Sequence, residues 1–158
     1  MTWIRQKLAA CGDRIACYEA GKEWSYAEFI ELIDHAATRV PSKGAAVIEV
    51  QAPTTIEGLA MILAIGETGH IALPLPPELP EAEQDKMRLI ANSSQLYNQL
   101  EGSGLVLFSS GTSREPKGML HNLDALLGRY KNLSARKDRS LLLLLIDHIG
   151  GLDSAFRC

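Results

Sequence analysis

The stretch Leu105-Val106-Leu107-Phe108-Ser109-Ser110-Gly111-Thr112-Ser113-Arg114-Glu115-Pro116-Lys117-Gly118 decides the fold expected for this chain of 158 residues. Its first four residues are apolar and typical of a buried strand. The residues that follow combine hydroxyl groups, glycines and a lysine, a composition suited to binding an anion. Open α/β sheets place their ligand crevices at the carboxyl ends of strands, where this loop would emerge. The stretch therefore predicts an anion site in an α/β protein.

Each residue type in this loop has a physical reason to contact a phosphate. Hydroxyl groups donate hydrogen bonds, glycines allow a close approach and a positive φ, and lysine supplies a mobile positive charge. The expected binding residues are Ser109, Ser110, Gly111, Thr112, Ser113, Lys117 and Gly118. A nucleoside triphosphate is the expected ligand. The commoner phosphate loop, in which lysine leads straight into a helix, is excluded because Pro116 precedes Lys117.

The loop resembles the phosphate-binding signature of the adenylate-forming enzymes, which include acyl-CoA synthetases, adenylation domains and luciferases. That signature reads [ST]-[ST]-G-[ST]-[ST]-G-x-P-K-G, and nine of its ten positions fit residues 109–118. The departure is Arg114, which stands where the family has glycine. Its side chain would strain the turn if the backbone there needs a positive φ, or would add a second cation near the phosphates.

A second segment of the chain strengthens this resemblance. The apolar run Leu141–Ile146 opens into Asp147-His148-Ile149-Gly150-Gly151. A comparable segment of the family lies beside the carboxylate of the acid, so the resemblance gives His148 that role. A histidine at a strand end fits a structural role equally well. His121 also matches a histidine frequent in the family, and it fits a polar residue at a helix start at least as well.

The rest of the sequence alternates between strand and helix signals. A turn at residues 20–22 predicts a hairpin of residues 14–25, and Ser25 and Glu28 have the spacing of a helix capping box. Further signals predict a strand at 45–50, a helix opened by a second box at 54–57, a strand at 71–73, a stiff proline connector at 74–80 and a helix at 81–91. A helix and a strand are expected after the loop. This order predicts an α/β fold with a parallel or mixed sheet and crossover helices.

The amino-terminal half carries two further matches to the family, so the resemblance covers nearly the whole chain. Residues 24–29 match the start of the family's first helix, and residues 69–75 match one of its strands. Trp24, Tyr26 and Phe29 are expected in the core rather than at a ligand.

Composition excludes several classes of function. The 16 basic residues are dispersed among 19 acidic ones, without the basic stripe that binds nucleic acid. The run Leu141–Ile146 is far shorter than a membrane span, and the amino terminus lacks a signal-peptide layout, so a cytoplasmic protein is expected. Three cysteines and four scattered histidines show no disulfide framework or metal spacing. Any metal is therefore expected to arrive with the nucleotide.

The resemblance implies ATP-dependent activation of a carboxylic acid. Its carboxylate attacks the α-phosphorus of ATP, pyrophosphate leaves, and the acyl-adenylate is usually passed to a thiol of coenzyme A or a carrier protein. Lys117 and the loop hydroxyls would balance the charge of the leaving pyrophosphate, Mg²⁺ would bridge the phosphate oxygens, and His148 would lie nearer the acid.

Family members are several times longer than this chain. Residues 1–158 are therefore expected to be an incomplete amino-terminal part of an AMP-binding domain, without the remainder and the lid domain, and inactive alone. The alternative is a non-catalytic or degenerate adenylation-like subunit that acts as a binding module. An unrelated nucleotide hydrolase is disfavoured, because no Walker-type lysine is present.

Overall fold

The computed structural model describes residues 2–42, 46–51, 54–93, 102–109, 116–132 and 154–155. Its helices are α1 (Thr2–Cys11), α2 (Tyr26–Ala37), α3 (Ile56–Glu67), α4 (Glu81–Ala91) and α6 (Leu123–Gly128). Its strands are β1 (Ile15–Glu19), β2 (Lys22–Ser25), β3 (Val47–Gln51), β4 (Ile71–Leu75), β5 (Gly104–Ser109) and β6 (Lys117–Asn122). No helix in this described part is long and apolar enough to cross a membrane.

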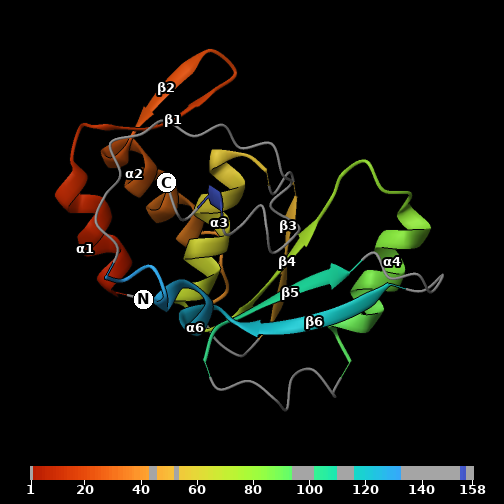
Figure 1. Cartoon of the computed structure of the whole chain (residues 1–158). Coiled ribbons are helices and arrows are strands. Elements are labelled where there is room, and N and C mark those ends of the chain that lie inside the picture. Colours follow the sequence, from red (N-terminus) through yellow and green to blue (C-terminus); the bar gives the residue numbers. More distant parts are fainter. Residues whose placement is uncertain are drawn as a thin grey trace.

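The central sheet has four strands in the order β3-β4-β5-β6. The first three strands are parallel, and β6 runs antiparallel to β5. Helix α4 lies on one face of the sheet and α3 on the other, with α2 and α1 beyond α3 (Figure 1). The hairpin β1–β2 forms a separate sheet that projects from this layered body (Figure 1). The expected α/β fold with a mixed sheet is confirmed.

Strand β5 is buried on both faces of the sheet. Leu105 and Leu107 pack into the cluster that the sheet forms with α2, α3 and α6. Val106 and Phe108 pack into the second cluster, against α4. Because successive side chains of a strand point to opposite faces, a continuous apolar run fits a strand covered on both sides. The apolar run expected as a buried strand is thus confirmed.

The first capping box is present as expected, whereas the second was placed one residue too early. The Ser25 Oγ accepts from the Glu28 N–H at 3.1 Å, and the Glu28 carboxylate accepts from the Ser25 N–H at 2.8 Å. Helix α3 is capped by Thr55 instead of Thr54, and the Thr55 Oγ1 accepts from the Gly58 N–H at 2.9 Å. Glycine at this third helical position has no side chain to reach back, so no box forms.

Helix α1 was not expected from the sequence, and tertiary contacts hold it. The Arg5 guanidinium donates to both carboxylate oxygens of Glu67 on α3, at 2.6 and 2.7 Å, and to Asp34 on α2 at 2.5 Å. These carboxylates, Glu67 first, raise the pKa of Arg5 and keep it charged. One arginine therefore joins three helices, through partners that lie far along the chain.

The proline connector begins later than expected, because Pro74 and Leu75 belong to β4. Proline lacks an N–H and is disfavoured inside a sheet. Here the pairing of β4 with β5 covers only Ile71 and Ala72, so Pro74 lies beyond it. On its other side Pro74 is in register with Val50 of β3, so the proline stands where only one neighbouring strand is paired.

His70 holds together the amino-terminal ends of the parallel strands. Its side chain is 3% exposed, its Nδ1 accepts from the Ala46 N–H at 3.2 Å, and its Nε2 donates to the Pro41 carbonyl at 2.7 Å. Its backbone carbonyl accepts from the Gly104 N–H at 3.0 Å. Both ring nitrogens are satisfied, so His70 acts as a structural residue.

Candidate functional site

The edge of the sheet formed by the carboxyl ends of the parallel strands also carries the start of β6. Strands β3, β4 and β5 end there at Gln51, Leu75 and Ser109. Because β6 is antiparallel, its first residue, Lys117, lies at the same edge and pairs directly with Ser109. The expected loop therefore leaves the sheet at the edge where ligands of open α/β sheets bind.

The element after the loop is a strand, which corrects the expected helix. Residues 117–122 form β6, and α6 begins only at Leu123, where the Asn122 side chain accepts from the Ala125 N–H at 2.8 Å. Lys117 and Met119 are exposed, whereas Gly118 and Leu120 are partly buried. Such alternation is typical of a strand with one covered face, but over six residues it is a weak signal.

Of the predicted loop residues, the structure describes Ser109, Lys117 and Gly118. Ser110, Gly111, Thr112, Ser113 and Arg114 lie outside the described residues, and so does His148. Ser109 is partly buried and Lys117 is exposed. Directly opposed residues of an antiparallel pair have Cα atoms about 4.5 to 5.5 Å apart, so the register brings this hydroxyl and this ammonium group to the two ends of one loop.

The glycine at position 118 has a packing role, which corrects the expected positive φ. Gly118 is not among the described glycines with positive φ. A Cβ atom at this position would lie 2.9 Å from the Ile90 Cγ2 and 3.2 Å from the Phe108 Cε1. Its missing side chain therefore lets α4 and the ring of Phe108 close on the start of β6.

At the amino terminus of α3, the helix that follows β3, two N–H groups already have acceptors. A helix amino terminus attracts anions through its unpaired N–H groups and its dipole. In α3 the Ile56 N–H donates to the Glu19 carboxylate at 3.0 Å, and the Gly58 N–H donates to Thr55. A carboxylate of β1 thus takes the place that a phosphate would occupy. The sequence carries no local signal for this contact, because Glu19 lies 37 residues from Ile56.

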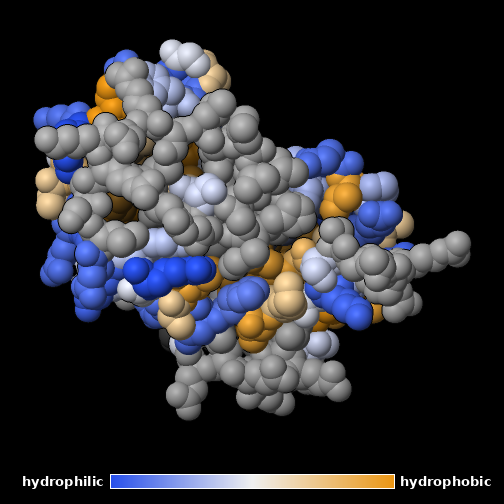
Figure 2. All heavy atoms as spheres, viewed as in Figure 1, coloured by the Kyte–Doolittle hydropathy of each residue, from blue (hydrophilic) through white to orange (hydrophobic). Residues whose placement is uncertain are grey.

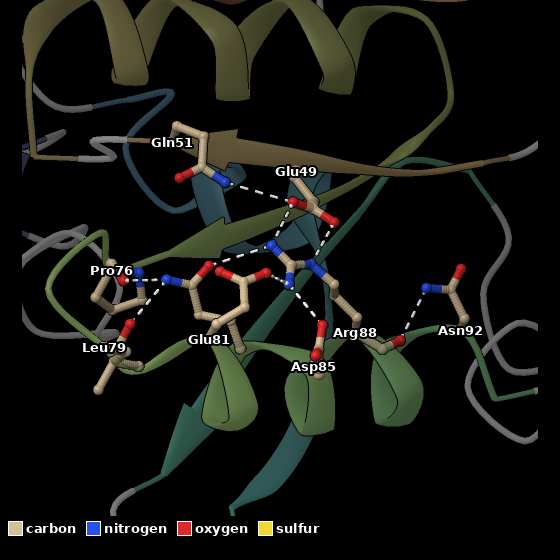
Figure 3. A network of polar contacts seen from close by, with 9 residues as sticks. Glu49, Gln51, Pro76, Leu79, Glu81, Asp85, Arg88 and Asn92 are labelled. Carbon is tan, nitrogen blue, oxygen red and sulfur yellow. Dashed lines mark hydrogen bonds and ion pairs between the residues drawn. The ribbon is translucent and has the colours of Figure 1, made fainter.

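The arginine of α4 is also engaged by acidic groups. The Arg88 guanidinium contacts Glu49 on β3 at 2.8 and 3.2 Å, Glu81 at 2.6 Å and Asp85 at 2.8 Å (Figure 3). These carboxylates, Glu49 first, raise the pKa of Arg88. By contrast, no described residue forms an ion pair or hydrogen bond with the side chain of Lys117. Among the described residues, nothing therefore competes with a ligand for Lys117.

His121 lies within β6, opposite Leu105, so the alternative of a polar residue at a helix start is wrong, and the match to a family histidine stays a prediction. Burial, followed by the charge of Arg129, lowers the pKa of His121 and favours the neutral ring. Its Nε2 is buried and has no hydrogen-bond partner among the described residues. His121 thus lies on the face of the sheet that α3 covers, toward the end of β6 that is away from Lys117.

Three or more metal-ligating side chains do not gather anywhere in the described ranges. That metal arrives with the nucleotide stays a prediction. What the described groups at this edge can do is bind a polyanion: Lys117 supplies charge, and the Ser109 hydroxyl supplies a hydrogen bond.

The fold is that of the amino-terminal portion of adenylate-forming enzymes. One solved structure with this fold is the o-succinylbenzoate CoA synthetase MenE from Bacillus subtilis, in complex with its acyl-adenylate intermediate. It matches this chain with a TM-score of 0.73 and 18% sequence identity. The match covers 98% of this chain and 52% of the MenE chain. The amino-terminal subdomain of NpsA from Klebsiella oxytoca, in complex with 3-hydroxyanthranilyl-AMSN, has a TM-score of 0.74 and 19% identity over 99% of this chain and 49% of that one.

Sequence comparison finds a nonribosomal peptide synthetase among the relatives of this chain. The probable non-canonical nonribosomal peptide synthetase CymA from Salinispora arenicola is 23% identical over 84% of this chain and 2% of its own length. No family model matches the sequence. The chain spans about half of the two solved structures and a small part of CymA. The resemblance to adenylate-forming enzymes that the sequence predicts is confirmed.

Proposed function

We propose that this chain is an incomplete amino-terminal part of a carboxylate-adenylating ligase and that the loop between β5 and β6 binds the β- and γ-phosphates of ATP. One observation carries the proposal: the strand register sets Lys117, whose side chain no described residue engages, opposite Ser109 at the ligand edge of the sheet. Support also comes from complexes of MenE with ATP and magnesium and with its acyl-adenylate intermediate.

The proposed reaction joins a small carboxylic acid to AMP. A carboxylate oxygen attacks the α-phosphorus, the bond from that phosphorus to the bridging oxygen breaks, and pyrophosphate leaves with the bonding electrons. Lys117 stabilises the charge that develops on this leaving group, which is the main task in phosphoryl-type transfer. Ser109 and the loop hydroxyls orient the phosphates. Mg²⁺ supplies further charge neutralisation when it is bound to the nucleotide.

Several finer parts of the function belong to the same proposal. His148 lines the pocket of the acid, and coenzyme A or a carrier protein accepts the acyl group. The protein acts in the cytoplasm, where ATP is available. The rest of the AMP-binding domain and a lid domain complete the active site, so residues 1–158 alone bind nucleotide without turnover.

The test compares ATP binding by the chain and by its Lys117→Ala variant at low salt, with isothermal titration calorimetry. Loss of one charged phosphate contact is expected to weaken binding about tenfold, because hydrogen bonds to charged groups contribute about 1.5 kcal/mol or more. Lys86→Ala is the matched control, since Lys86 is an exposed lysine on α4. Equal dissociation constants for the chain and for Lys117→Ala would contradict the proposal.

A further inference from the structure

Helix α4 crosses one face of the sheet and contacts strands at both of its described edges. At one edge, Arg88 binds both carboxylate oxygens of Glu49 on β3 (Figure 3). At the other edge, Ile90 lies against Gly118 of β6. The strand order β3-β4-β5-β6 places these two contacts at opposite sides of the sheet. A polar contact thus holds α4 against β3, and an apolar contact holds the same helix against β6.

The contact at β6 is tight because the strand residue is glycine. A Cβ atom at position 118 would lie 2.9 Å from the Ile90 Cγ2, and real Cβ atoms are not found so close to other atoms. The Phe108 ring, on the residue paired with Gly118, lies on the same face, with its Cε1 atom 3.2 Å from that Cβ position. An aromatic ring over a glycine of the neighbouring strand is a known way to hold an edge strand in register. A side chain of α4 and one of β5 therefore both pack over Gly118 on the α4 face of the sheet.

Gly118 is bonded directly to Lys117, and this links the packing to the phosphate site. The peptide unit between the two residues is planar, so a shift of the Gly118 backbone moves the Lys117 backbone with it. Successive strand residues point to opposite faces, which leaves the Lys117 side chain on the face away from α4. Ile90 therefore acts on the position of Lys117 without touching any ligand.

We propose that α4 positions the phosphate-binding lysine, with Ile90 as the positioning residue that sets the start of β6 through its γ2 methyl group. This inference rests on the proposed function for its ligand, and on the distances around Gly118 for its geometry. The neighbouring Leu89 is 77% exposed and faces away from the sheet, so it serves as an internal comparison on the same helix.

The experiment uses the full chain and four variants at position 90 or its neighbour. Ile90→Ala removes the γ2 methyl, and Ile90→Leu removes it while keeping the volume of the side chain. Ile90→Val keeps a γ2 methyl, and Leu89→Ala removes an exposed apolar group. ATP dissociation constants are measured at a temperature where each variant is folded, together with the backbone amide resonances of Ser109 and Lys117.

Ile90→Ala and Ile90→Leu are expected to weaken ATP binding about threefold to tenfold and to shift the two amide resonances, because small displacements of a contact group carry large costs. Ile90→Val is expected to bind within about twofold of the unchanged chain, as is Leu89→Ala. A residue that only stabilises the core would lower the melting temperature without this pattern. Ile90→Leu remains informative if Ile90→Ala does not fold, since it preserves side-chain volume.

Two results overturn different proposals. If Ile90→Leu changes the ATP affinity and the Lys117 resonance no more than Leu89→Ala does, Ile90 has no positioning role, even where Lys117→Ala weakens ATP binding. If Lys117→Ala binds ATP as the unchanged chain does, the proposed function fails, and the role of Ile90 is then decided by the Lys117 and Ser109 resonances alone.

Discussion

The two hairpins of this chain obtain their shape in different ways. In β1–β2, the turn residues Ala20 and Gly21 have φ angles of 50° and 81°, and apart from its chain neighbours no described residue has an atom within 4 Å of the position of a Gly21 Cβ. In β5–β6, the strand residue Gly118 lacks a positive φ, and its surroundings leave no room for a Cβ. One glycine serves the backbone of a tight turn, whereas the other serves the packing of distant side chains.

The difference extends to the strands themselves. Strand β1 exposes Ile15 and Tyr18, at 41% and 51%. Strand β5 is buried over its whole apolar run, and β6 leaves Met119 45% exposed. Figure 2 shows hydrophobic residues on the face that carries the β5–β6 hairpin. A projecting hairpin depends on local turn chemistry, while a hairpin inside the layered body depends on what packs against it.

Gly118→Ala is expected to produce the largest change in stability. The new Cβ would meet Ile90 and the Phe108 ring, and forcing an extra methyl group into a packed site costs about 1 to 3 kcal/mol in the free energy of unfolding. Urea denaturation measures it. Gly128→Ala is the control, because outside its own helix no described residue has an atom within 4 Å of a Cβ at Gly128. Equal effects of the two substitutions would contradict the packing role of Gly118.

Gly21→Ala is expected to have a smaller effect of about 1 kcal/mol, because an L residue in the left-handed region is strained even where space is open. Asparagine tolerates this region better, so Gly21→Asn should lose less. Urea denaturation of both variants tests the comparison. A Gly21→Ala variant as stable as the unchanged chain would show that the turn does not depend on glycine.

The third expected effect, a change of folding stability with pH, is the smallest. The group in β6 acts on the acid side, and the group in β1 acts on the alkaline side. His121 of β6 has a pKa lowered by burial, so the unfolded chain binds its proton first and stability falls as pH drops below about 6.5. Cys17 of β1 has a pKa raised by burial and then by Glu19, so stability falls as pH rises past its ordinary value of 9.0.

Denaturation across pH measures both trends. His121→Gln should flatten the acid side, and Cys17→Ala should flatten the alkaline side, because each replacement cannot titrate there. If His121→Gln leaves the acid side as steep as before, another group causes the loss.

Local signals made much of the fold predictable. The Ser25–Glu28 box, the turn at Ala20 and Gly21, and the helix at 81–91 are present as expected. Each depends on residues close together in the chain. The capping residue of α3 was misplaced by one position because two threonines adjoin there and both have the right chemistry.

The errors share a cause. The sequence predicts a helix where β6 lies, because six residues with weak alternation carry little information without their partner β5. Helix α1 was missed because Glu67 and Asp34, which hold its Arg5, lie far along the chain. Within the candidate site, the types and order of the loop residues were readable, while the role of Gly118 was not.

The sequence by itself determined the chemistry of the loop, the resemblance to adenylate-forming enzymes and the alternation of elements, because these depend on residue type and short spacing. Only the tertiary structure decided that Lys117 stands opposite Ser109, that Glu19 fills the amino terminus of α3, and that Ile90 presses on Gly118. Such contacts join segments separated along the chain, and strand pairing and close packing select them only when the layers assemble.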